Sequence, residues 1–328
     1  MVRKIAIIGL GSIGTRHLKI IKQIRPDIKV VLVRSGNGGY KSEEKLADNK
    51  VYSIKDAIKL GIQAAIISSP AVFHIEQVIE LFQSGIHVFV EKPLSNSLEN
   101  SKELNFYKNE KSLVGLLGYC LRYHPAALRF KDIVNSDEIG TIFKVNVECK
   151  SYLPDWRPNQ DYRQSVSVRK ELGGGVLLEL SHELDYTIWF FGKIISVDAE
   201  VKNSGILGNV DDSAKLKLKN RNNVPISICL DFNNRNTSRK CIVHSSEGQI
   251  CWDIKENKIV WRKNNGLIKE ENYMQDYNDM YIKQLQHYFD CIEKDKEPKV
   301  KLIDGINVLE IVEAAKKSSN LKKIVALT

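Results

Sequence analysis

The chain has 328 residues, of which 43% are hydrophobic, 27% charged and 8% aromatic. This length favours two domains, and this composition excludes disordered, collagen-like and disulfide-scaffold proteins. Lys and Arg number 49 against 40 Asp and Glu, which gives a net charge of +9. Such a surplus is compatible with nucleic acid, an anionic membrane or a phosphorylated ligand, and the total does not choose among them.

The six cysteines form no Cys-x-x-Cys pair. We therefore expect no zinc ribbon or thioredoxin-type motif and a reduced, cytoplasmic chain. The uninterrupted apolar run before Gly9 has only four residues, which is too short for the apolar region of a signal peptide. No apolar run of about 18 residues occurs, so we expect no membrane-spanning segment.

From residue 4 to about 120, short apolar runs alternate with amphipathic stretches, a pattern of strands and helices in turn. The predicted strands are Lys4–Ile8, Lys29–Val33, Ala64–Ser68, Ile86–Val90 and Ser112–Tyr119, and the predicted helices are Ile13–Ile24, Val72–Gln83 and Ser97–Asn109. The alternation predicts an α/β fold with a doubly wound parallel sheet, a Rossmann-type domain over 1–122.

After residue 123 the pattern changes to that of an α+β domain over 123–328. We predict a short helix, a strand over Thr141–Tyr152, an irregular segment over Leu153–Leu172, an apolar helix ending at Gly192, strands that include Ala214–Lys219 and Ile226–Leu230, and helices near Tyr277–Lys294 and Asp304–Ser319. The period of two in these strands predicts an open, mostly antiparallel sheet with one wet face.

A glycine-rich motif follows the first predicted strand and opens the first predicted helix. The motif is Gly9-Leu-Gly11-Ser12-Ile13-Gly14. The first glycine permits a tight turn, the second lets the backbone approach a pyrophosphate, and the third lets the helix pack against the strand. Since the helix N-terminus also favours an anion, the motif predicts a dinucleotide site, against the alternative of a purely structural turn.

The residue that would meet the adenosine ribose is basic. NAD-specific sites carry an acidic residue here, whereas this chain has Arg34 twenty positions after Gly14, followed by Ser35. A guanidinium matches a 2′-phosphate, so we favour NADP over NAD; the alternative is that Arg34 lies over the adenine ring, which suits either cofactor. Residues 1–122 have a net charge of +7 and residues 123–328 a net charge of +2, which places most of the surplus in the predicted cofactor domain.

Two further segments carry candidate catalytic residues. Glu91-Lys92-Pro93 follows the fourth predicted strand, where the carboxyl ends of parallel strands line a ligand crevice. On a helix over 176–191, Glu179, His182, Asp185 and Tyr186 would share one face, and His182 is a candidate general base. A zinc site is disfavoured because Tyr186 stands where a second His is needed, and a buried structural histidine is the alternative.

These motifs together resemble the glucose-fructose oxidoreductase, inositol dehydrogenase and MocA family over essentially the whole chain. The resemblance rests on the glycine motif, Ser69-Pro70 with His74, Glu91-Lys92-Pro93, Gly118–Pro125 with Arg122 and His124, Gly173–Asp185, and the segment from Asp304 to Glu310. It implies hydride transfer between a nicotinamide and a sugar or polyol carbon, a C-terminal domain that binds substrate and forms the dimer face, and a homodimer or homotetramer.

The resemblance also implies residue roles. Five residues would contact the cofactor in addition to the glycine motif, Arg34 and Ser35: Ser69, Pro70, His74, Glu91 and Lys92. Lys92 would contact the reacting hydroxyl, His182 would exchange its proton, and Asp185 would orient the site. Family members carry an Asp four residues before this His, whereas here Glu179 precedes His182 by three. Glu179 is the expected replacement for that Asp.

The segment before the glycine run is rich in aromatic and basic side chains. Aromatic faces pack on sugar rings and arginines grip carboxylates or phosphates. We therefore expect an anionic or nucleotide-linked sugar substrate, although a plain surface loop is the alternative. Within the family, the Ser181–Tyr186 segment resembles that of enzymes of surface-glycan and amino-sugar assembly, and this resemblance implies a substrate such as a UDP-N-acetylhexosamine oxidised at C3. The expected substrate-binding residues are Arg122, His124, Trp156, Tyr162, Arg163 and Arg169, with Lys92 and His182.

Other functions remain open. A free-sugar or inositol-type dehydrogenase fits the same motifs, and so does a non-catalytic dinucleotide-binding sensor, although such a sensor can lose Lys92 or His182 and this chain keeps both. Binding to nucleic acid is disfavoured because the second half is nearly neutral.

Overall fold

The computed structural model describes residues 1–36, 38–99, 101–104, 113–157, 161–274 and 276–327. The chain forms two compact units. The first contains Met1–Cys120 and Tyr277–Ile306, and the second contains Leu121–Asp276 and Asn307–Thr328. The predicted division at residue 122 differs from these units in two respects: residues 121 and 122 belong to the second unit, and residues 277–306 pack with the first unit. We retain 1–122 and 123–328 as proposed domains.

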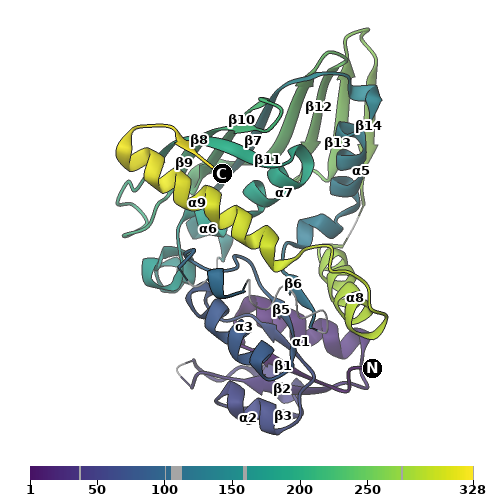
Figure 1. Cartoon of the computed structure of the whole chain (residues 1–328), viewed down its shortest axis with the longest axis vertical. Helices are drawn as coiled ribbons and strands as arrows, with labels where there is room; N and C mark the ends of the chain where they lie inside the picture. The colour runs from purple at the N-terminus through teal and green to yellow at the C-terminus, as the bar shows by residue number, and fades with distance from the viewer. Residues whose placement is uncertain (37, 100, 105–112, 158–160, 275, 328) are drawn as a thin grey trace. The chain divides into compact units, whose positions relative to one another are not determined.

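The first unit is built on a six-stranded parallel sheet with helices on both faces (Figure 1). The strand order is β3-β2-β1-β4-β5-β6, the arrangement of a dinucleotide-binding fold. The strands are β1 (Lys4–Ile8), β2 (Lys29–Val33), β3 (Asn49–Val51), β4 (Ala64–Ile67), β5 (His87–Val90) and β6 (Gly115–Leu117). The central strands read as apolar runs because both faces of the sheet are covered.

The helices that lie wholly in the described part of this unit are α1 (Ser12–Ile24), α2 (Ile54–Lys59), α3 (His74–Gln83) and α8 (Asp279–Glu293). α8 comes from the far end of the chain and packs beside α1. Glu293 accepts hydrogen bonds from Val2 N at 2.9 Å and Arg25 Nη1 at 3.0 Å. Tyr288 donates to Ala65 O at 3.3 Å. These contacts explain why 277–306 belongs with the first unit.

The second unit is built on a nine-stranded sheet of order β14-β13-β12-β11-β7-β10-β9-β8-β15. Its strand pairs are antiparallel except for β7 with β10, which are parallel. The strands are β7 (Ile142–Tyr152), β8 (Ile194–Lys202), β9 (Ser213–Asn220), β10 (Pro225–Asp231), β11 (Asn233–Ser245), β12 (Gly248–Asp253), β13 (Lys258–Lys263), β14 (Ile268–Asn272) and β15 (Val325–Ala326). The mostly antiparallel sheet is as predicted.

Helices α5 (Pro125–Val134), α6 (Val176–Glu179) and α7 (His182–Phe191) contact this sheet, and α9 (Leu302–Leu321) continues into the unit from Asn307 (Figure 1). β9 alternates buried and exposed side chains, with Ala214, Leu216 and Leu218 inward and lysines outward. The period-two pattern therefore predicted both the strand and its wet face.

Several predicted elements need correction. The apolar helix ending at Gly192 is wrong as a single helix, because the Leu180 backbone (φ −95°, ψ 29°) leaves the helical region and separates α6 from α7. β3 and α2 were not predicted, since elements of three and six residues carry little periodicity. The predicted strand over Ser112–Tyr119 is shortened to β6, and its first residue lies outside the described part. In the predicted helix over 97–109, residues 100 and 105–109 lie outside the described part; residues 97–99 are not helical and Ser101–Glu103 forms a 3-10 turn, so the predicted start at Ser97 is wrong.

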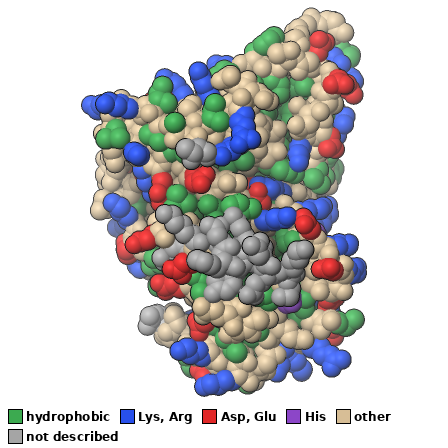
Figure 2. Space-filling view, in the orientation of Figure 1, with side chains coloured by type: hydrophobic (Ala, Val, Ile, Leu, Met, Phe, Trp, Pro, Cys, Tyr) green, Lys and Arg blue, Asp and Glu red, His purple; other side chains and the backbone are tan. Residues whose placement is uncertain are grey.

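Several lysines of the first unit are held in local ion pairs. Lys22 and Lys29 both contact Asp48, at 2.7 and 3.2 Å, and Lys50 contacts Glu44 at 3.1 Å. On the face shown in Figure 2, blue Lys and Arg side chains are interspersed with red Asp and Glu side chains. The surplus on this face is therefore spread out rather than gathered into one tract.

Candidate active site

The glycine motif forms the tight turn at the carboxyl end of β1. Gly9 has φ +89°, and its N–H donates to Val33 O at 3.0 Å. A Cβ at Gly9 would lie 2.8 Å from Ser68 O, and a Cβ at Gly14 would collide with the Gly9 carbonyl. Both glycines are therefore required by the fold, one for its backbone conformation and one for the contact of α1 with the β1 turn.

Gly11 has the space that a phosphate group needs. A Cβ there would meet nothing within 4 Å among the described residues, and its φ of −69° is accessible to any residue. Ser12, Ile13 and Gly14 form the first turn of α1, which holds no acidic residue and no side-chain cap. These N–H groups at the positive end of a 13-residue helix fit the pyrophosphate of a dinucleotide.

Arg34 follows β2, next to Ser35, and its guanidinium already has partners within its own loop. Nη2 donates to the carbonyls of Gly38 and Gly39 at 3.1 and 2.8 Å, and Nη1 lies 3.5 Å from Glu44 Oε1. The Arg34 residue is only 8% exposed. A hydrogen bond from Lys50, together with the charge of Arg34, lowers the pKa of Glu44, so this carboxylate is ionised at neutral pH. A 2′-phosphate that reached Arg34 would therefore meet a carboxylate beside it.

His74 ties together the turns that follow β4 and β5. Its buried ring places Nε2 2.8 Å from Ser69 O and Nδ1 2.9 Å from Pro93 O. Pro70 caps the 3-10 turn that leads into α3, and the Ser69 hydroxyl donates to Gln77 at 2.7 Å. With both ring nitrogens facing carbonyls, His74 is placed to hold the turns that carry Ser69 and Lys92.

Glu91 and Lys92 directly follow β5. Glu91 is buried, its Oε1 lies 2.6 Å from Nε2 of the fully buried His17 on α1, and its Oε2 accepts from the Lys92 N–H at 3.2 Å. A Cβ on Gly118, after β6, would come within 3.0 Å of the Glu91 carboxylate. Glu91 thus fixes the backbone from which Lys92 projects, and its burial favours this positioning role over cofactor contact.

In the second unit, Arg122 and Asp185 form a buried ion pair. Nε and Nη2 of Arg122 donate to the two Asp185 oxygens at 3.0 and 2.6 Å, and Asp185 is fully buried. His124 is 5% exposed and caps α5, with Nδ1 accepting from Ala126 N at 3.1 Å. This burial favours positioning roles for Arg122 and His124 over the predicted contacts with substrate.

Glu179 and His182 stand on either side of the break between α6 and α7. Both side chains are half-buried, Glu179 ends α6 and His182 begins α7. The glycine run before α6 packs tightly: a Cβ on Gly174 would lie 2.5 Å from Val166 O, and one on Gly175 would collide with Asp211. Asp211 also accepts from Leu177 N at 3.0 Å. The run therefore anchors the preceding irregular segment to the start of α6.

The segment predicted to be irregular, Leu153–Leu172, forms a series of 3-10 turns in its described part. Trp156 is 38% exposed, and its indole N–H donates to Ser151 at 3.0 Å. Tyr162 is half-buried, Arg169 is exposed, and Arg163 is exposed with its guanidinium on Asp161 at 2.9 Å. These residues share one segment of the second unit, and the turn that ends at Trp156 contacts the turn that carries Tyr162 and Arg163.

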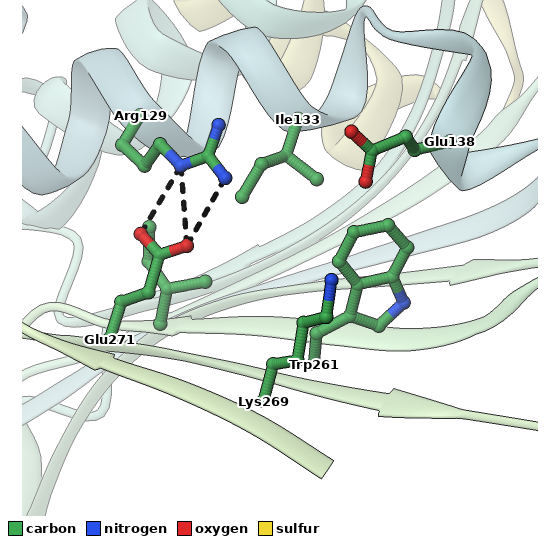
Figure 3. Close-up of a pocket in the computed structure, with 7 residues that line it drawn as sticks. Arg129, Ile133, Glu138, Trp261, Lys269 and Glu271 are labelled. Atoms are coloured by element: carbon green, nitrogen blue, oxygen red, sulfur yellow. Dashed lines mark hydrogen bonds and ion pairs between the residues drawn. The ribbon is translucent and has the colours of Figure 1, made fainter. Parts of the chain in front are cut away.

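A shallow pocket in the second unit has none of the predicted site residues in its lining. Figure 3 shows the guanidinium of Arg129, from α5, facing the carboxylate of Glu271 on β14 across this pocket. Among the described residues, no group of three or more His, Cys, Asp or Glu side chains is arranged to hold a metal ion. No helix in the described part of the chain is long and apolar enough to span a bilayer.

The structure adds residues that the sequence analysis did not single out. They are His17 behind Glu91, Glu44 beside Arg34, Asp211 behind the glycine run, and the Glu183–Arg239 pair behind His182. Glu44 lies within ten residues of its partner, whereas Glu183 and Arg239 are 56 positions apart. Only chain folding brings the latter two together, and no local pattern marks them.

Comparison with known families identifies both halves of the chain. Residues 3–119 match the model described as "Oxidoreductase family, NAD-binding Rossmann fold", and residues 131–327 match "Oxidoreductase family, C-terminal alpha/beta domain". Both are parts of the glucose-fructose oxidoreductase, inositol dehydrogenase and MocA family.

Individual relatives agree with this assignment. The chain is 25% identical over 347 residues to myo-inositol 2-dehydrogenase of Thermotoga maritima, covering 99% of this chain and 98% of the relative. It is 25% identical to the NAD⁺-dependent scyllo-inositol 2-dehydrogenase of Bacillus subtilis, covering 95% and 93%. A levoglucosan dehydrogenase solved with NADH and levoglucosan shares the fold, with a TM-score of 0.86 at 18% identity over 99% of each chain. The chain belongs to the glucose-fructose oxidoreductase, inositol dehydrogenase and MocA family of NAD(P)-dependent oxidoreductases.

Proposed function

We propose that the protein transfers a hydride between a nicotinamide cofactor and a ring hydroxyl or ketone carbon of a sugar. The observation that carries this proposal is Lys92 at the carboxyl end of β5, in the same strand-end region as the Gly9–Gly14 turn at the end of β1. Ligands of open parallel sheets bind at this edge. The nicotinamide, when bound, supplies the hydride acceptor or donor; the protein supplies positioning and proton transfer.

Each candidate residue has a distinct task in this proposal. Lys92 donates a hydrogen bond to the reacting oxygen and stabilises the negative charge that develops there. His182 accepts the hydroxyl proton during oxidation and returns it during reduction. Glu179 replaces the aspartate that family members carry before this histidine. Asp185 acts through its ion pair with Arg122, which fixes α7 one turn after His182.

The substrate class follows from the side chains near the irregular segment. The exposed indole of Trp156 offers a surface for a sugar ring, and the exposed Arg163 and Arg169 offer cationic groups to an anionic substituent. A nucleotide-linked amino sugar, such as a UDP-N-acetylhexosamine oxidised at C3, combines both features. A free sugar or inositol is the alternative, and the names of the inositol dehydrogenase relatives favour it.

Two finer proposals concern the cofactor and the assembly. We propose NADP as the preferred cofactor, with the Arg34 guanidinium exchanging its Gly38 and Gly39 carbonyl partners for the 2′-phosphate. NAD remains the alternative, because Glu44 opposes a phosphate at this position. We also propose a homodimer or homotetramer formed through the open face of the nine-stranded sheet.

The test is a screen of cofactor reduction against free sugars, inositols and nucleotide-linked sugars, repeated with Lys92→Ala. We expect turnover to fall by about 10²–10⁴-fold in this variant while NADPH binding, followed by its fluorescence, survives. Lys59→Ala is the matched control, since the Lys59 side chain is 78% exposed on α2. Unchanged turnover in Lys92→Ala would refute the assigned role.

A further inference from the structure

Arg239 is held directly behind the start of α7. This residue lies on β11, and its Nε donates to Glu183 Oε1 at 2.7 Å. Glu183 is fully buried and directly follows His182. The Glu183 carboxylate therefore fixes the direction of the Arg239 guanidinium.

The rest of the guanidinium is available to a ligand. Within the described residues, Nη1 and Nη2 of Arg239 donate no hydrogen bond, although an arginine carries five N–H donors. The side chain keeps 28% of its surface exposed. Burial opposes its charge, but the Glu183 carboxylate outweighs burial and raises the pKa of Arg239, so the donors stay charged. Because the Glu183 carboxylate balances the charge of Arg239, the pair is neutral overall. A ligand would therefore be held by the oriented N–H groups of Arg239 and not by a net positive charge.

An exposed aromatic ring lies along the same face of the sheet. Arg239 pairs across from Cys149 on β7, and Ser151 is the next residue of β7 on that face. Two residues of a strand span about 7 Å. The indole of Trp156 is hydrogen-bonded to Ser151 and packs on Phe232 with ring centroids 5.2 Å apart. Arg239 and Ser151, the hydrogen-bond partner of the Trp156 indole, are thus neighbouring positions on one face of the sheet.

We propose that Arg239 binds an oxyanion substituent, a carboxylate or a phosphate, on the sugar that the enzyme oxidises. The sugar ring lies against Trp156, and the two Nη groups of Arg239 grip two oxygens of the substituent in the bidentate geometry that guanidinium favours. This inference rests on the proposed function, which supplies the sugar as the substrate. It concerns the binding of that sugar, so its test measures affinity and not turnover.

The experiment measures affinity for glucose, glucuronate and glucose 6-phosphate by calorimetry on the cofactor-saturated enzyme. We expect wild type to bind at least one of the two anions about tenfold more tightly than glucose. In Arg239→Gln the affinity for that anion should fall roughly tenfold to hundredfold, while the affinity for glucose stays unchanged. The anion that loses affinity identifies the substituent. Arg235→Gln is the matched control, because Arg235 lies on the same strand, 71% exposed and stacked over Tyr152 at 4.0 Å.

A second variant separates binding from folding. Arg239→Gln leaves the buried Glu183 carboxylate unpaired, so the double variant Arg239→Gln/Glu183→Gln removes both charges and keeps a hydrogen-bonding pair. Equal affinities of wild type and the double variant for both anions, or a wild type that does not favour either anion over glucose, would overturn the proposal. Anion binding that depends on Arg239 without any cofactor reduction would instead count against the proposed function and leave this inference standing.

Discussion

The guanidinium of Arg122 holds both carboxylate oxygens of Asp185, and neither side chain is more than 7% exposed. Arg122 lies in the 3-10 turn Cys120–Tyr123 before α5, and Asp185 lies on α7. The pair therefore joins two segments 63 residues apart. Because the pair is buried one turn after His182, we propose that it positions the proposed base.

Breaking this pair should cost far more stability than breaking an exposed one. Asp185→Asn leaves the Arg122 charge buried without its counter-ion, and we expect a loss of about 3–5 kcal/mol in the free energy of unfolding, measured with urea. Glu271→Gln is the control, because the Arg129–Glu271 pair is 46% and 38% exposed and should contribute about 1 kcal/mol or less. Similar losses in the two variants would contradict the buried-pair interpretation.

The two glycines of the cofactor turn should respond differently to alanine. At Gly11 a Cβ meets open space, so Gly11→Ala should fold normally but weaken cofactor binding, because the methyl group enters the space assigned to the pyrophosphate. At Gly14 the Cβ collides with the Gly9 carbonyl, so Gly14→Ala should lower the thermal midpoint as well. Thermal unfolding and cofactor titration of both variants check this; a Gly11→Ala protein with unchanged cofactor affinity would contradict it.

Local patterns predicted what depends on local sequence. β1 and β2 were predicted to the residue, and α1 within one residue of its start, because an apolar run, a glycine turn and an amphipathic helix follow one another directly. The break at Leu180 was missed because apolar periodicity continues across it. The partners of Arg122, Arg34 and Arg239 were missed for a different reason: sequence shows a guanidinium but not which carboxylate or carbonyl reaches it after folding.

The burial of His74 predicts a pH dependence of stability. Burial lowers the pKa of His74 below its ordinary value of 6.5, although the Ser69 and Pro93 carbonyls oppose this. Between its lowered pKa in the folded protein and pH 6.5, His74 binds a proton in the unfolded chain but not in the folded protein. This residue therefore makes the free energy of unfolding decrease as the pH is lowered, by at most about 1.4 kcal/mol per pH unit.

His74→Asn isolates this contribution from those of other histidines. Asparagine does not titrate, so the variant loses the His74 part of the slope. Its stability deficit relative to wild type, measured by urea unfolding between about pH 7.5 and 5.5, should shrink as the pH falls. A deficit that stays constant or grows over this range would show that His74 is not kept neutral by burial.

The Arg34–Glu44 pair predicts how the cofactor preference can be changed. Because Glu44 lies 3.5 Å from Arg34 Nη1, its carboxylate both attracts the guanidinium and repels a 2′-phosphate. Glu44→Gln should tighten NADP binding severalfold and leave NAD binding unchanged, whereas Arg34→Ala should weaken NADP binding about tenfold more than NAD binding.

Glu43→Gln is the matched control, since Glu43 pairs with Lys19 at 2.9 Å instead. The check is a titration of NAD and NADP against wild type and the three variants. If wild type binds NAD more tightly than NADP, and Arg34→Ala weakens both cofactors equally, then Arg34 holds its own loop and does not bind the 2′-phosphate.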